Sequence, residues 1–454
     1  MLGFDMLQLT TDKPSGKRGE TTLKEIVRPV RLKSVIAASL AVWMVMLSLG
    51  SAVAMANGYE GRPSTENSLG LQVKAAILID ADSGQVLYEV NSGEPLPAAS
   101  MTKLMTEYIV LEEISNERLS WDEVITTSAE AAAVPPDGSS VFLAQGDQHT
   151  VRDLYKAMAV GSANDATIAL ASQIAGSEQS FVTKMNEVAD KLGLKTAIFT
   201  SATGLSETTV ISAADMAKLA QIILSEHPEF LEYSKLQEYK FRERDVDPIV
   251  NINWMLGSNV NQTGLKHLAY EGVDGMKTGF IDAAGYNFTG TVKRGDQRFI
   301  SVVMDTATKS ARFNETAKMY NYGFSTFEKK TVLPPKSVVE SVKSVKIKKG
   351  KKKSLPVVTD KDITFMVKKG VEPKIEVVAS DVKTEAELVA PIPVGTVVGT
   401  VTYKYTDPDT KLELKRTVNL ITTEDGQKAG WFRLMFRAIG NFFASLFNGI
   451  VNLF

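Results

Sequence analysis

The stretch Ser100-Met101-Thr102-Lys103 begins the pattern that decides the fold of this chain. Ser162-Ala163-Asn164 and Lys277-Thr278-Gly279 follow it, in that order and at spacings that suit a single domain. Each of the three motifs recurs by chance in proteins of this length. Their order and their local surroundings make them informative.

Ser100 and Lys103 are the candidate nucleophile and base. A serine hydroxyl is a poor nucleophile until a base removes its proton. A lysine three residues later lies on the same face of a helix, so its amine can reach the serine hydroxyl. At the start of a helix, backbone N–H groups and the positive end of the helix dipole also favour an oxyanion.

Lys103 can act as a base only if its pKa is depressed. An ordinary lysine has a pKa of ~10.4, so a shift of roughly 3 units is needed at neutral pH. Burial and a nearby like charge lower a lysine pKa in this way, and Lys277 is the natural like charge. In an isolated S-x-x-K motif the lysine would more simply be a surface residue on an amphipathic helix. The other two motifs argue against that interpretation here.

Composition limits the classes of function that this chain can have. Its 454 residues are enough for two domains, and 51 Lys and Arg against 53 Asp and Glu leave a net charge of −2, which gives no reason to expect a nucleic acid partner. The chain has no cysteine, which excludes disulfides, thiolate catalysis and cysteine-bound zinc. Its histidines, His149, His227 and His267, stand in no recognisable metal or triad pattern. We therefore expect no metal and no cofactor.

Helices and strands are mixed along residues 57–333. Residues 75–91 and 288–304 each read as a hairpin, with a glycine-containing turn between two apolar runs. Helices are predicted to begin at three places: near Ser100, at the capping pair Thr150 and Asp153, and at the capping pair Ser212 and Asp215. These elements predict a mixed α/β domain.

The pattern changes at Pro334-Pro335. Beyond it, short β-type runs separated by Gly, Pro and Asp predict a small β-sandwich-like domain over residues 336–425. The predicted runs are residues 344–347, 363–367, 375–379, 396–405 and 412–421. Residues 346–353 hold six lysines, for which a solvated hairpin turn is the simpler interpretation and contact with teichoic acid or phospholipid the alternative.

Both ends of the chain carry apolar segments. Residues 1–56 read as a signal peptide, with basic residues before an apolar run and an A-x-A site at Ala54-Met55-Ala56; an uncleaved membrane anchor is the alternative. Residues 428–454 predict an amphipathic helix, with Arg433, Arg437 and other polar residues in an arc of about 120°. Such a helix lies in a membrane interface without spanning the membrane. A core helix packed on the β-rich domain is the alternative.

The surroundings of the three motifs resemble the low-molecular-weight penicillin-binding proteins that are serine-type D-alanyl-D-alanine carboxypeptidases. The motif set itself is typical of β-lactamases and penicillin-binding proteins. The resemblance runs from about residue 71 to about residue 324, and more loosely beyond. It implies a β-lactamase/transpeptidase-like domain with an antiparallel sheet and helices. The stretches that carry it are Pro97-Ala98-Ala99-Ser100-Met101-Thr102-Lys103, Ser162-Ala163-Asn164-Asp165-Ala166 and Val273-Asp274-Gly275-Met276-Lys277-Thr278-Gly279.

The resemblance implies roles for the residues around the reacting bond. Ser162 would relay a proton between Lys103 and the leaving group, and Asn164 would bind the peptide carbonyl of the substrate. Taken alone, this segment would read as a turn or a helix cap. The backbone N–H groups of Ser100 and Phe280 would form the oxyanion hole.

The resemblance also implies how the substrate is held. Lys277 and Thr278 would orient the substrate carboxylate, and Gly279, which lacks a Cβ, would let an extended substrate lie along the strand edge. Arg312 would bind the terminal carboxylate, a planar group that arginine binds through two N–H donors. Taken singly, Arg312 would read as a surface arginine.

The leading hypothesis is a serine-type D-Ala-D-Ala carboxypeptidase that trims the terminal D-alanine from peptidoglycan stem peptides through an acyl-enzyme and is covalently inhibited by β-lactams. One alternative is a β-lactamase, although no convincing counterpart of that class's deacylating glutamate is found and such enzymes lack an appended β-domain. The other is a non-catalytic β-lactam sensor or cell-wall-binding protein, although every catalytic position is intact. We expect an exported protein at the outer face of the cytoplasmic membrane or in the cell wall.

Overall fold

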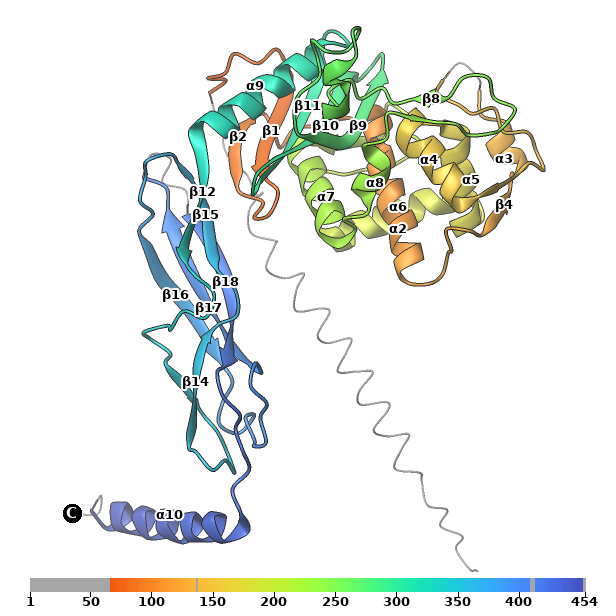
Figure 1. Ribbon diagram of the computed structural model, residues 1–454. Coiled ribbons are helices and arrows are strands. Elements are labelled where there is room, and N and C mark those ends of the chain that lie inside the picture. The colour runs from red at the N-terminus through yellow and green to blue at the C-terminus, as the bar shows by residue number, and fades with distance from the viewer. Residues whose placement is uncertain (1–65, 136–137, 409–412, 452–454) are drawn as a thin grey trace, which may run out of the picture. The chain divides into compact units, whose positions relative to one another are not determined.

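The computed structural model describes residues 66–135, 138–408 and 413–451, and these form the mixed α/β fold expected from the sequence, with antiparallel sheets (Figure 1). The predicted signal peptide, residues 1–56, lies outside the described residues.

A five-stranded antiparallel sheet forms the centre of the part of the chain that carries the three motifs, in the order β2-β1-β11-β10-β9. Both predicted hairpins are present, as β1–β2 and β10–β11, and β1 pairs with β11 although they are far apart in sequence. The third motif lies on β9, at one edge of the sheet. The strands are β1 (Ala75–Asp80), β2 (Val86–Val90), β9 (Val273–Ile281), β10 (Gly285–Arg294) and β11 (Gln297–Thr306).

Helices cover both faces of this sheet. On β1, Ile77 and Ile79 point into an apolar core shared with the helices that carry the first two motifs, whereas Ala76 and Leu78 point into a second core shared with α9. This alternation is the two-residue period of a strand buried on both sides. The helices are α2 (Lys103–Ser115), α3 (Ala129–Ala132), α4 (Val151–Gly161), α5 (Asn164–Ala175), α6 (Glu178–Leu192), α7 (Ala213–Glu226), α8 (Phe230–Ser234) and α9 (Ala311–Thr326).

Local sequence signals set where two of these helices begin. The Thr150 hydroxyl accepts a hydrogen bond from the Asp153 N–H before α4, and the Ser212 hydroxyl accepts one from the Asp215 N–H before α7. Both are the capping pairs expected from the sequence, because such side chains satisfy N–H groups that a helix start leaves unpaired. The remaining short elements are two 3₁₀ turns, η2 (Ala99–Thr102) and η3 (Gly257–Asn261), and three paired ribbons: β3 (Pro95–Pro97) with β6 (Val210–Ser212), β4 (Val124–Thr126) with β5 (Gln148–Thr150), and β7 (Glu238–Tyr239) with β8 (Ile249–Val250).

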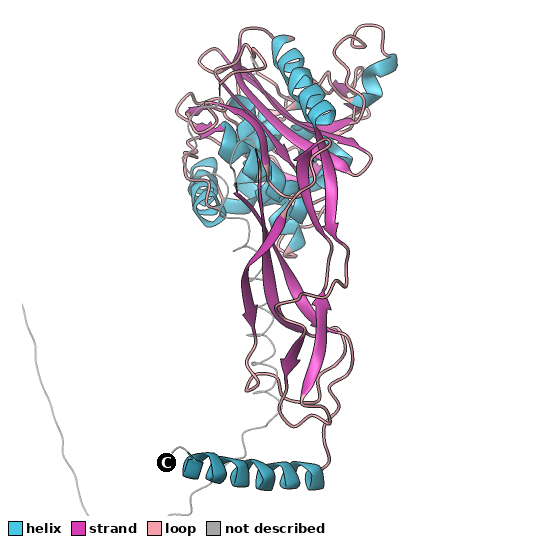
Figure 2. Ribbon diagram, turned by 90° about the vertical axis from the view of Figure 1, so that its left-hand side faces the viewer, coloured by secondary structure: helices cyan, strands magenta, loops and turns pink. Residues whose placement is uncertain are grey.

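Between α9 and α10, strands joined by loops and turns are the regular secondary structure of the described residues (Figure 2). One sheet has the order β13-β14-β18-β17-β16, and β12 pairs with β15. Strand β12 lies before Pro334-Pro335, so strand pairing in this part begins ahead of the change in sequence pattern. Strand β14 was not expected, because Pro356 interrupts its pattern; this proline is exposed and occupies a strand all the same. The strands are β12 (Phe327–Leu333), β13 (Ser344–Lys346), β14 (Ser354–Thr359), β15 (Ile363–Lys368), β16 (Ile375–Val382), β17 (Val397–Thr406) and β18 (Glu413–Thr422).

The last described element is α10 (Trp431–Val451), a single helix with exposed aromatic side chains. Trp431, Phe436 and Phe442 are 64%, 66% and 64% exposed. Within the described ranges, no helix is long and apolar enough to cross a membrane.

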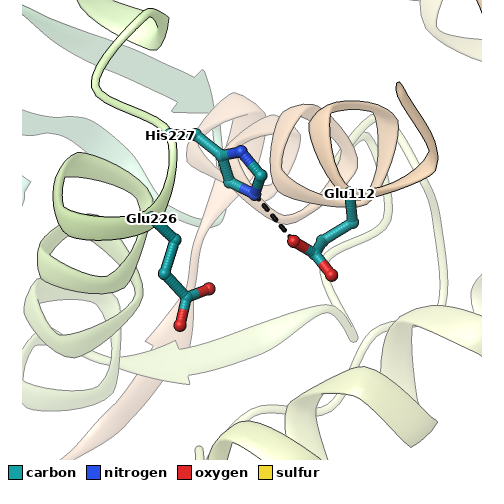
Figure 3. Close-up of side chains that lie close together, drawn as sticks. All are labelled: Glu112, Glu226 and His227. Carbon is teal, nitrogen blue, oxygen red and sulfur yellow. Dashed lines mark hydrogen bonds and ion pairs between the residues drawn. The ribbon is translucent and has the colours of Figure 1, made fainter. Parts of the chain in front are cut away.

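An ion pair ties α2 to the end of α7 (Figure 3). His227 Nε2 lies 2.9 Å from Glu112 Oε1, and the Tyr108 hydroxyl donates to Glu226 Oε2 at 3.0 Å. Glu229 Oε1 lies 3.5 Å from His227 Nδ1. The imidazole is buried, so this pair joins two core helices away from the motif residues.

We expect the His227 imidazolium to stabilise the catalytic domain mainly at acidic pH. Burial lowers the pKa of His227, but the hydrogen bond to Glu112 and the charges of Glu112, Glu229 and Glu226 outweigh burial, so its pKa is raised above 6.5. The stabilisation is therefore full below about pH 6.5 and is lost as the pH rises through the folded-state pKa. His227→Gln should lower the Tm by about 2 °C more at pH 6 than at pH 9 in circular dichroism scans. An equal loss at both pH values would contradict the ionised pair.

Candidate active site

The first motif places its serine and lysine side by side. Ser100 lies in the 3₁₀ turn η2, and Lys103 is the first residue of α2. The sequence pattern predicted an α-helix from about Ser100; the tighter turn precedes it, and the two side chains still meet. Lys103 Nζ donates to Ser100 Oγ at 3.1 Å. The serine hydroxyl is therefore in direct contact with a possible base.

Lys103 is 0% exposed, which excludes a surface lysine. Its amine also donates to Asn164 Oδ1 at 2.7 Å and to the Thr203 carbonyl oxygen at 2.8 Å. Burial lowers the pKa of Lys103 well below its usual value, and the charge of Lys277 lowers it further. These are the two physical causes that a lysine base requires.

The second motif joins the end of α4 to the start of α5. Ser162 ends α4 in the left-handed conformation, with φ 59° and ψ 27°, a backbone state that a non-glycine residue adopts at some cost in energy. Its Oγ accepts a hydrogen bond from Lys277 Nζ at 2.9 Å. Asn164 begins α5, and because Lys103 uses its oxygen, its amide nitrogen is the group able to donate to a carbonyl.

The third motif lies on the edge strand β9, where Lys277 and Thr278 are buried. Burial lowers the pKa of Lys277 to about 8, the charge of Glu107 acts to raise it, and the charge of Arg312 acts to lower it. Phe280 is 45% exposed and stacks on Tyr286, with ring centroids 4.3 Å apart.

Close packing requires a glycine at position 279, a requirement that the sequence did not reveal. A Cβ at this position would lie 2.7 Å from the Ala98 carbonyl oxygen and 3.2 Å from the Met101 nitrogen. Asn287 on β10 fixes the same segment, because its Nδ2 donates to the Pro97 carbonyl oxygen at 3.0 Å. The close approach that needs a glycine is thus between β9 and the turn that holds the nucleophile.

Arg312 is 2% exposed on the first turn of α9, so the interpretation as a surface arginine is wrong. Its Nη1 donates weakly to the Gly279 carbonyl oxygen at 3.4 Å, and its guanidinium lies 4.7 Å from the centre of the Phe313 ring. Burial lowers its pKa to about 10, against the effect of Tyr286. Such a desolvated guanidinium beside β9 is suited to binding a carboxylate.

Three residues at the site were missed by reasoning from the sequence. Glu107 lies one turn beyond Lys103 on α2 and is 1% exposed. Thr203 offers its carbonyl oxygen to Lys103, and Gly204, with φ +80°, lies against the Ala99 carbonyl. No periodic or motif signal distinguishes these three from an ordinary helix residue and an ordinary turn. All three interact with motif residues or their immediate neighbours.

Together, the fold and the site are those of a serine hydrolase in which a buried lysine contacts the serine hydroxyl. The family model described as D-alanyl-D-alanine carboxypeptidase matches residues 62–308, and the model described as penicillin-binding protein 5, C-terminal domain, matches residues 327–428. The chain therefore belongs to the D-alanyl-D-alanine carboxypeptidase family of low-molecular-weight penicillin-binding proteins and is a serine peptidase.

Similar proteins agree with this assignment. The D-alanyl-D-alanine carboxypeptidase DacF of Bacillus subtilis is 34% identical over 383 residues, which cover 84% of this chain and 92% of that protein. A solved structure of the peptidoglycan synthesis regulatory factor (PBP3) from Streptococcus pneumoniae superposes with a TM-score of 0.68 at 27% identity, covering 79% of this chain and all of that one. Penicillin binding protein 5 from Haemophilus influenzae gives a TM-score of 0.63 at 28% identity, covering 81% of this chain and all of that one.

We expect Gly204→Ala to damage both stability and the nucleophile. The new Cβ would lie 1.9 Å from the Ala99 carbonyl oxygen, which immediately precedes Ser100, so the turn must move. Gly146→Ala is the matched control, because Gly146 has φ +88° and nothing within 4 Å. The control should lose about 1 kcal/mol of unfolding free energy in denaturant titrations, and Gly204→Ala about 3 kcal/mol or more.

Only Gly204→Ala should also slow covalent labelling by a fluorescent penicillin. Equal effects of the two substitutions on stability and labelling would show that the contact with Ala99 is unimportant.

Proposed function

We propose that the chain acts on peptidoglycan stem peptides through an acyl-enzyme formed on Ser100. Ser100 Oγ attacks the carbonyl carbon between the two terminal D-alanines while Lys103 accepts the hydroxyl proton. The carbon–nitrogen bond then breaks, and the proton reaches the leaving D-alanine nitrogen by way of Ser162. Water hydrolyses the acyl-enzyme and restores Ser100. The observation that supports this most directly is the buried Lys103 amine 3.1 Å from Ser100 Oγ.

The remaining motif residues are proposed to hold the substrate. Thr278, Lys277 and Arg312 offer donors for its terminal carboxylate, and the Asn164 amide nitrogen suits its peptide carbonyl. An extended peptide can lie antiparallel along β9, because this strand is at the edge of its sheet. The backbone N–H groups of Ser100 and Phe280 are proposed to stabilise the oxyanion.

A β-lactam is proposed to acylate the same serine, because its strained amide presents a carbonyl carbon to the same nucleophile. Penicillin-binding protein D2 from Listeria monocytogenes, 35% identical with a TM-score of 0.50 over 58% of this chain and all of that one, has been solved in a cefotaxime-bound form. The family membership of this chain supports the carboxypeptidase over the β-lactamase and sensor hypotheses.

We also propose that the protein is exported and attached to the outer face of the cytoplasmic membrane by α10. The aromatic side chains of this helix, including Trp431, Phe436 and Phe442, are well exposed, which argues against the core-helix alternative. Arg433 and Arg437 lie on the same helix and donate to the Lys351 carbonyl oxygen, Arg437 also to that of Gly350; their remaining N–H groups are proposed to contact anionic headgroups. Export rests on the predicted signal peptide in residues 1–56.

Lys103→Arg should reduce D-alanine release from a diacetyl-L-Lys-D-Ala-D-Ala peptide by about 10²–10⁴-fold, the range that a general base contributes. Arginine keeps the charge but does not deprotonate in proteins, so it cannot accept the Ser100 proton. Fluorescent penicillin should label this variant equally poorly. Ser100→Ala is the reference for complete loss of both signals. Near-normal activity of the arginine variant would place the base elsewhere.

Deletion of residues 428–454 should release a soluble and fully active carboxypeptidase from membranes, because it removes the proposed anchor and leaves the catalytic domain whole. Fractionation followed by the D-alanine assay measures both effects. Truncated protein that stays with the membranes would assign attachment to the N-terminal apolar run. Truncated protein that misfolds would favour a core role for the helix.

A further inference from the structure

Glu107 is an acidic side chain buried among the cations of the active site. It lies on α2 one turn beyond Lys103 and is 1% exposed. The three motifs supply Lys103 and Lys277 but no acid, and α9 adds Arg312; each of these three basic residues is at most 3% exposed. Basic groups buried close together repel one another when protonated and lose their hydration, so a site of this kind is costly without a counter-charge.

The carboxylate of Glu107 does not join neighbouring segments through hydrogen bonds. Both of its oxygens are buried, and neither has a hydrogen-bond partner among the residues that the structure describes. The Tyr155 hydroxyl on α4 faces it and acts to lower its pKa, without reaching the geometry of a full hydrogen bond. A buried carboxylate without hydrogen bonds destabilises the folded state, so what Glu107 contributes to the protein is its negative charge.

The charge of Glu107 and the charges of the two buried lysines act on one another. Burial raises the pKa of Glu107, and the charges of Lys277 and Lys103 act to lower it. Burial lowers the pKa of both lysines; the charge of Glu107 acts to raise both, and the charge of Lys277 acts to lower that of Lys103. The three groups are therefore coupled. The Glu107 carboxylate favours the protonated form of Lys277, and a protonated Lys277 disfavours a proton on Lys103.

We propose that Glu107 is a positioning residue for the acylation chemistry, whose carboxylate is the counter-charge that keeps Lys277 protonated and, through Lys277, keeps Lys103 free to accept the proton of Ser100. Glu107 touches neither the substrate nor Ser100 in this scheme. The inference rests on the proposed roles of Lys103 and Lys277.

The pH range of this effect follows from the titration of Glu107 itself. Burial raises the pKa of Glu107 to about 7, against the opposing effects of Lys277, Tyr155 and Lys103. Its charge is therefore present above about pH 7 and absent well below it. Lys277, with a pKa of about 8, loses its proton in the adjacent range. The wild-type enzyme should thus differ from a variant without this charge only at neutral and alkaline pH.

The test compares kcat/KM for D-alanine release, and the rate of labelling by fluorescent penicillin, in wild type and Glu107→Gln from pH 5.5 to pH 9.5. The profiles should coincide below about pH 6. The alkaline limb of Glu107→Gln should lie about one pH unit lower, so that its rate at pH 8.5 is about tenfold below wild type. The acid limb should move less. Removing the Glu107 anion lowers the pKa of Lys103, whereas losing the charge of Lys277 raises it, so the two effects oppose each other.

Glu113→Gln is the matched control for removing a buried carboxylate from the same helix. Glu113 is 6% exposed and pairs with Arg118 and Lys184, both at 2.5 Å, away from the motif residues. Its pH profile should match that of wild type. Glu107→Asp, which keeps the charge, should recover most of the alkaline limb.

Two results would overturn the inference: a uniform loss of rate in Glu107→Gln with both limbs unmoved, which indicates a packing role, or a profile equal to wild type. If Glu107→Gln does not fold, a folded Glu107→Asp decides instead: an alkaline limb about one pH unit below that of wild type, although the charge is kept, would overturn the inference. Failure of the wild-type enzyme to release D-alanine would instead overturn the proposed function, so the two failures are distinguishable.

Discussion

The structure depends on one costly contact, the burial of the Lys103 amine beside the Ser100 hydroxyl. A buried amine must find hydrogen-bond partners, and here they come from Ser100, from Asn164 on α5 and from the Thr203 carbonyl. Each acceptor belongs to a different segment of the chain. Helix α2, the α4–α5 junction and the loop before β6 must therefore all be correctly placed for this one side chain to be stable.

The same contact explains why the surrounding backbone is tightly constrained. Ala99, just before the nucleophile, has a φ of 50°, and Ser162 has a φ of 59°. Gly204 and Gly279 pack so closely on this turn that a side chain at either position would meet the backbone at Ala98 or Ala99. Strained residues of this kind persist only where the neighbouring structure holds them. The fold thus keeps the serine in place from several directions at once.

Much of this arrangement could be predicted from the sequence, because motif order and strand or helix period are local signals. Both hairpins, the two capped helices and the mixed α/β class followed from such patterns. The 3₁₀ turn at Ser100, the role of Gly204 and the buried Glu107 could not be predicted, because each depends on a neighbour distant in sequence. Strand β14 was missed for a local reason, since its Pro356 signals an interruption; the strand tolerates this proline because its pairing with β18 begins only at Val357.

The pairing of β1 with β11 has a consequence for how such a site comes into being. Ala75 lies opposite Met304 in this ladder, so the sheet cannot close until nearly the whole catalytic part of the chain is available. Contacts of such sequence separation form late, because closing long loops is slow. The segment bearing Ser100 is synthesised early, yet it meets the Lys277 strand only afterwards. A chain that ends before β11 therefore lacks the closed sheet, and the three motifs can assemble only once the residues up to Thr306 are available, whether or not the strands of the C-terminal part have formed.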